Sequence, residues 1–167
     1  PLMDLNHLIP ICHREGWNEI VIANHFWDAK MPGADEWYAS QDLQHVQKIL
    51  PFPHSDGIKI RFACETEFCG GKKIGISPES YDAFEFIIVP FNHLHNNFSR
   101  PIDCTTTKQV AQLYIDHFED LLQIDLPWKK VGIAHLTCSL TYPGPLLYEV
   151  FDQLDMTRLS ACFRFLA

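Results

Sequence analysis

The sequence contains no long apolar run and no excess of positive charge. No window approaches the roughly 18 consecutive apolar residues that a transmembrane helix needs, so we expect no membrane span. The chain has 21 acidic against 13 basic residues, which gives a formal net charge of −8. Nucleic acids and anionic membrane surfaces are bound through clusters of Lys and Arg, so this balance argues against both as partners.

Several motifs of well-known enzyme and metal-binding classes are also missing. The sequence has no Gly-rich phosphate loop, no Ser nucleophile elbow and no P-loop. None of its six cysteines forms a C-x-x-C pair, which argues against a zinc ribbon or a thioredoxin motif. The cysteines are scattered, and secreted disulfide scaffolds are usually much smaller than 167 residues. We therefore expect reduced thiols and a cytoplasmic location.

The apolar content that is present is enough for one folded domain. Hydrophobic residues make up 47% and aromatic residues 13% of the chain, so it can bury a sizeable core. Apolar periodicity has begun by Leu2 and still runs at Leu166. We therefore expect residues 1–167 to be a single-domain fragment of a longer protein, cut short at both ends.

Short apolar runs alternate with amphipathic stretches along the chain. The runs, rich in β-branched residues, predict strands over residues 19–23, 58–63, 84–89 and 131–134. The stretches predict helices over residues 2–12, 41–50, 110–122, 146–154 and from 157 onward, and a helical turn at 77–81. Gly16 is expected to end the first helix, and Ser40 to cap the second. This alternation predicts an α/β protein with parallel strands, as an open sheet or as part of a barrel.

A side chain that can bind a metal follows each of the four predicted strands. In chain order these residues are His25, Glu65, His93 and His135. A single His at a strand end is more often structural, and a single Glu there is more often a solvated loop residue. Because the carboxyl ends of parallel strands meet at one edge, the full set predicts a shared site. Neutral imidazoles and carboxylates bind zinc, manganese or iron, and a carboxylate can bridge two metals roughly 3.5–4 Å apart.

Other polar residues carry weaker signals. Cys64 neighbours Glu65 on a strand and should point to the opposite face, so it is not expected to be a ligand. Arg100 is the guanidinium near a predicted strand end and is a candidate for binding a substrate phosphate. Trp27 and Trp37 are candidates either for lining a substrate pocket or for ordinary packing. The remaining histidines are expected to be surface or packing residues: His7, His13, His45, His54 and His117.

The order of these motifs resembles the PHP (polymerase and histidinol phosphatase) family. Residues 16–25, Gly-Trp-Asn-Glu-Ile-Val-Ile-Ala-Asn-His, resemble the family's segment in which a Gly and a strand lead to Thr-Asp-His. Ala63-Cys64-Glu65 resembles its Gly-x-Glu. The strands that lead to His93 and His135 resemble its strands that end in a metal-binding His.

This resemblance implies a fold and an activity. The fold is part of a distorted (β/α)7 TIM-like barrel with parallel strands, holding two or three divalent metal ions. The implied ligands are His25, Glu65, His93 and His135, with His95 as a substitute for His93 and Glu67 as a residue supporting the ligands. Glu65 would bridge the metals, and Glu65 and His135 would serve catalysis. The implied activity is that of a metal-dependent phosphoesterase, in which metal-activated water attacks the phosphate monoester of a small substrate.

The chain also departs from the family's pattern. The family's opening His-x-His belongs before Leu2 and its closing Asp-x-His beyond Ala167, so we expect a site built from this stretch alone to be incomplete and inactive. Asn24 stands where the family has Asp. Two alternatives therefore remain: a catalytically inactive PHP-like binding or regulatory domain, and a hydrolase of C–N bonds on a similar metal barrel.

Overall fold

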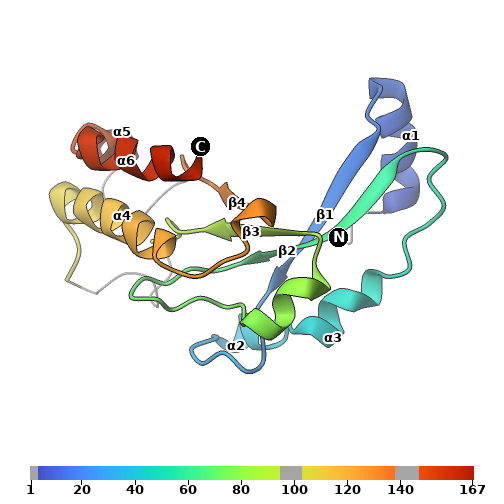
Figure 1. Cartoon of the computed structure of the whole chain (residues 1–167), viewed down its shortest axis with the longest axis horizontal. Helices are drawn as coiled ribbons and strands as arrows, with labels where there is room; N and C mark the ends of the chain where they lie inside the picture. The colour runs from blue at the N-terminus through green and yellow to red at the C-terminus, as the bar shows by residue number, and fades with distance from the viewer. Residues whose placement is uncertain (1–3, 95–102, 138–146) are drawn as a thin grey trace.

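A four-stranded parallel sheet forms the centre of the computed structural model, which describes residues 4–94, 103–137 and 147–167 (Figure 1). The strands are β1 (Glu19–Phe26), β2 (Lys59–Thr66), β3 (Phe86–Pro90) and β4 (Val131–Ala134). They lie side by side in the order of the chain, and every neighbouring pair is parallel. The predicted α/β class with parallel strands is therefore confirmed.

Helices connect the strands and flank the sheet. The α-helices are α1 (Leu5–Glu15), α2 (Glu36–Ala39), α3 (Leu43–Val46), α4 (Thr107–Leu122), α5 (Leu147–Phe151) and α6 (Met156–Leu166). The 3-10 helices are η1 (Gln47–Ile49), η2 (Pro78–Ala83) and η3 (Trp128–Lys130). In Figure 1, α4, α5 and α6 gather at the left of the view, whereas α1 lies at the right beside β1. In the described part of the chain, none of the helices has the length and apolar character needed to cross a bilayer.

The predicted strands are found, but two of them are longer than expected. β1 continues to Phe26 and β2 to Thr66, so His25 and Glu65 lie on the strands and not after them. The reason is the ladder between these two strands, which continues through the polar residues and pairs His25 with Glu65. Backbone hydrogen bonds do not depend on side-chain polarity, so an apolar run underestimates the length of such a strand.

The prediction of a helix over 41–50 capped by Ser40 is wrong in its details. α3 begins after Asp42, whose carboxylate accepts a hydrogen bond of 2.9 Å from the backbone N–H of His45. Ser40 follows α2 instead, and its hydroxyl donates to the carbonyl of Trp37. Asp is as good an N-cap as Ser, and here the carboxylate two residues further on takes that place.

The hydrophobic core lies on one face of the sheet. Phe62, Cys64, Ile87 and Val89 all belong to it, and the alternation of side chains along paired strands puts them on the same face. Cys64 is fully buried on the side opposite Glu65, as predicted. α4 contributes one apolar face to the core, and its buried residues have the predicted helical spacing: Val110, Tyr114, Phe118, Leu121 and Leu122. The five cysteines that the structure describes are all buried and form no disulfide.

The opposite face of the sheet is polar at both ends and only partly covered. Near the start of the strands, the guanidinium of Arg61 donates to the carboxylate of Glu19 at 2.6 and 3.0 Å. In the middle, Val21 is 42% exposed. Phe86 leans over Gly132, where an added Cβ would lie 2.8 Å from the tip of the ring, so a larger residue there would displace the ring. His25 and Glu65 lie on this same face, at the carboxyl end of the strands.

His117 fastens the loop that follows β2 to α4. Its ring is buried, and its Nδ1 donates to the carbonyl of Phe91 at 3.1 Å. Its Nε2 lies so close to Gly70 that an added Cβ would be 2.4 Å away, and Gly70 has a φ of +79° that favours glycine. Next to it, the backbone N–H of Gly71 donates to Asp120 on α4. His117 is therefore a packing residue, in agreement with the sequence analysis.

Burial lowers the pKa of His117 below its ordinary value, so acid should destabilise the fold through this ring. The unfolded chain then takes up the proton at a higher pH than the folded one. The free energy of unfolding is therefore at its full value above the ordinary histidine pKa of about 6.5, and it decreases as the pH falls below that value. We expect the free energy of unfolding, measured with urea, to fall with a slope of up to about 1.4 kcal/mol per pH unit for this one proton.

The matched variants for this prediction are His117→Asn and His13→Asn. The first retains a donor near the Phe91 carbonyl but cannot take up a proton, so the acid-dependent loss should shrink. The second replaces an exposed histidine of α1 and should leave the slope unchanged. An equal slope in the His117→Asn protein and the unmodified protein would contradict the assignment.

Candidate metal centre

Four predicted ligands come together at the carboxyl end of the sheet. His25 and Glu65 are register partners on β1 and β2, so their side chains share one face. His93 follows β3 and His135 follows β4. Because the strands are parallel and in chain order, each of these segments leaves the sheet at the same edge.

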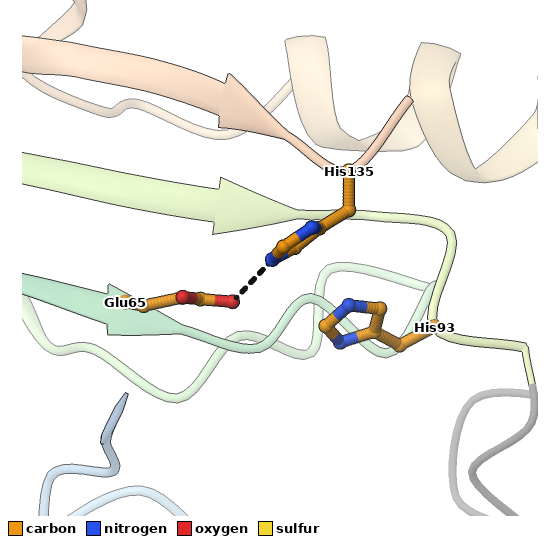
Figure 2. Close-up of side chains that lie close together, drawn as sticks. All are labelled: Glu65, His93 and His135. Atoms are coloured by element: carbon orange, nitrogen blue, oxygen red, sulfur yellow. Dashed lines mark hydrogen bonds and ion pairs between the residues drawn. The ribbon is translucent and has the colours of Figure 1, made fainter. Parts of the chain in front are cut away.

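Glu65, His93 and His135 form a first group that could hold a metal ion. One ligand atom from each lies within 4.8 Å of the others. Figure 2 shows the three side chains converging from β2 and from the segments after β3 and β4. Nε2 of His135 is 3.1 Å from Oε1 of Glu65, and the two imidazole rings are 5.1 Å apart between centroids. The side chain of His135 is 46% exposed and that of Glu65 only 16%, so the group opens to solvent at His135.

A second group shares Glu65 with the first. His25, Glu65 and Glu67 also bring one ligand atom each to within 4.8 Å of one another. Nδ1 of His25 is buried and has no hydrogen-bond partner among the residues that the structure describes. Such an atom costs free energy unless something binds it, and a metal ion is one group that would. The rings of Trp37 and Tyr38 meet that of His25 edge-on at 4.9 and 6.0 Å.

Glu67 is a buried carboxylate beside His93. Its side chain is 1% exposed, its two oxygens lie 2.9 and 3.0 Å from Nδ1 of His93, and the hydroxyl of Tyr38 donates to it. Burial and the charge of Glu67 raise the pKa of Tyr38, so the phenol stays protonated and acts as a donor. The resemblance implied that Glu67 supports the ligands, whereas the partner Tyr38 lies far away in the chain and has no signal in the sequence.

The backbone at His135 adopts a conformation that side chains rarely take. Its φ is +56°, in the left-handed region, which costs about 1–3 kcal/mol for a residue other than glycine. The amide of buried Asn92 donates to the carbonyl of His135 and holds that carbonyl in place. Neither feature is visible in the sequence, because a positive φ at histidine has no reliable pattern.

The remaining site predictions have different outcomes. His95 and Arg100 lie outside the described residues. Trp27 is 1% exposed and its indole N–H donates to the carbonyl of Met31, so it is a packing residue. Trp37 is 52% exposed next to His25. Asn24 alternates with His25 along β1, so its side chain lies on the opposite face of the sheet.

A scan against protein-family models and a search of curated proteins gave no match to this chain. The candidate metal centre therefore rests on the chain's own residues. Its three imidazoles and two carboxylates are a mixed nitrogen and oxygen donor set that suits zinc, manganese or iron. Nδ1 of His25, buried and without a partner in the described part of the chain, also fits a bound cation.

The strain at His135 can be measured by comparing two variants. His135→Gly and His135→Ala both remove the imidazole and its contact with Glu65, so they differ only in the backbone. Glycine tolerates a φ of +56°, and we expect His135→Gly to be the more stable by about 1 kcal/mol in urea unfolding. At an unstrained position alanine is the more stable by about 0.4–1 kcal/mol, because it has less freedom in the unfolded chain, so an alanine variant ahead by that amount would show that no strain is stored there.

Proposed function

We propose that this protein is a metal-dependent hydrolase of the PHP type, a phosphoesterase that acts on a small phosphorylated substrate. The observation that carries the proposal is the place of Glu65, which belongs to both groups of possible ligands. A carboxylate shared in this way is what a two-metal site needs, since it can bridge ions roughly 3.5–4 Å apart. In such a site the metals supply an activated water and a clamp for phosphate oxygens.

The residues of the chain divide the work of such a site. His93 and His135 complete one group around Glu65, and His25 lies in the other. The apolar face behind Glu65, where Cys64 is buried, keeps bulk water away from the back of the site. His135 is half exposed at the front, so a substrate would approach from its side.

We further propose that the sheet is part of a (β/α)7 barrel of the TIM type. In an open doubly wound sheet the strand order reverses and helices cover both faces. Here the order follows the chain, and the sheet's contribution to the core comes from one face only. The other face carries Phe86 over Gly132 and ends in His25 and Glu65, which suits the interior and the mouth of a barrel.

The alternative of an inactive binding domain loses its main support. It rested on Asn24, which replaces an Asp of the family. The side chain of Asn24 lies on the face opposite His25, so the replacement removes no group from the candidate centre. We therefore favour a catalytic function.

The proposal is tested by replacing the shared carboxylate. Glu65→Gln keeps the size of the side chain but removes its charge from both groups. We expect zinc or manganese affinity to fall by more than about 100-fold, beyond the 10–100-fold effect typical of a residue that only supports a ligand. Metal content after dialysis, together with hydrolysis of p-nitrophenyl phosphate and of an amide panel, measures both the site and the bond that is cleaved.

Glu85→Gln is the matched control, because Glu85 is a carboxylate at the opposite end of the same sheet, next to Arg61. Its metal content and activity should equal those of the unmodified protein. Both measurements use the full-length protein: unchanged metal content in its Glu65→Gln variant, or an unmodified full-length protein that binds no divalent metal, would refute the proposed function. Cleavage of amides but not of phosphate esters would replace phosphoesterase by C–N hydrolase.

A further inference from the structure

Glu67 lies deep in the protein, and its contacts come from distant parts of the chain. It follows β2, whereas Tyr38 belongs to α2 and His93 follows β3. Burying a carboxylate is costly unless it is paired and hydrogen-bonded. The Tyr38 hydroxyl and Nδ1 of His93 supply this compensation. Such a network orders all three side chains relative to one another.

The contact with Glu67 decides which nitrogen of His93 carries a proton. A carboxylate only accepts hydrogen bonds, so two oxygens beside Nδ1 favour the tautomer of His93 in which Nδ1 is the donor. In the neutral ring, Nε2 then holds the lone pair that a metal ion requires. Figure 2 shows the His93 ring next to the His135 ring, with both rings pointing toward Glu65.

Tyr38 is itself held in place. Its backbone N–H donates to the carboxylate of Asp35, the N-cap of α2, at 2.8 Å. Its ring packs against those of Trp27 and Trp37 at 5.6 and 4.7 Å. The ring that carries the hydroxyl is therefore held in position. A donor in a fixed position limits the positions that the Glu67 carboxylate can take.

We propose that Glu67 is a positioning residue, which Tyr38 holds in place and which fixes the tautomer and orientation of His93 for metal binding. This inference rests on the proposed function, because it takes His93 as a ligand. The competing role for Glu67 is that of a ligand in the group with His25 and Glu65. Positioning is favoured because both of its oxygens already lie within 3.0 Å of Nδ1 of His93.

The first experiment uses the metal-free protein, so that it does not depend on metal binding. Long-range ¹H–¹⁵N correlation spectra identify the protonated nitrogen of each histidine ring. We expect His93 to be protonated at Nδ1, and this preference to weaken in Glu67→Gln, whose neutral side chain is a poorer acceptor. Protonation at Nε2 in the unmodified protein would overturn the inference.

The second experiment measures zinc binding by competition with a chelator. Glu67→Gln should lower the affinity by about 10–100-fold without changing the number of ions bound per chain. Tyr38→Phe should lower it in the same direction but less. Tyr148→Phe, at a residue that is 64% exposed, is the matched control and should have no effect.

The outcomes separate the two roles. Loss of a bound zinc ion in Glu67→Gln would make Glu67 a ligand and overturn the positioning role, and so would unchanged affinity in both test variants. Thermal melts show whether Glu67→Gln folds. If it does not fold, the zinc affinity of Tyr38→Phe, which only removes a hydroxyl, tests the positioning role. An unmodified protein that binds no zinc would count against the proposed function, while the spectra of the metal-free protein would still decide the tautomer.

Discussion

The parallel pairing of β1 with β2 is the constraint on which the candidate site depends. It places His25 opposite Glu65 at the end of the two strands, on the face that the core does not use. A shift of the strand register by one residue would move the Glu65 side chain to the face of the sheet where Cys64 is now buried in the core. The apolar residues behind the sheet therefore fix the register, and through it they fix the face on which the carboxylate lies.

The site also contains features that cost stability. His135 has a positive φ, Nδ1 of His25 is buried without a partner among residues 4–94, 103–137 and 147–167, and Glu67 is a buried carboxyl group. Features of this kind persist only where the surroundings hold them in place, and they gather at functional sites. Here that support comes from Asn92 at the His135 carbonyl and from Tyr38 at Glu67. Their concentration at one end of the sheet is a physical reason to place a functional site there.

The segment after β2 shows how the scaffold stiffens this region. Glu67 begins a loop that is closed by a bridge between Phe68 and Ile74 and fastened to α4 through Gly70 and His117. Binding sites need supporting residues whose own positions are fixed by packing. The contact between His117 and Gly70 therefore supports the site at a distance, because it packs the loop that begins at Glu67 against α4.

The sequence by itself determined the alternation of strands and helices, because apolar periodicity follows directly from which face is buried, and the stripe on α4 is an example. It also indicated His25, Glu65, His93 and His135, since metal-capable side chains at four strand ends form a local pattern. Only the tertiary structure decided that Tyr38 meets Glu67 and that Glu67 meets His93. These contacts join residues far apart in the chain, and strand register and loop conformation, which no local pattern encodes, bring them together.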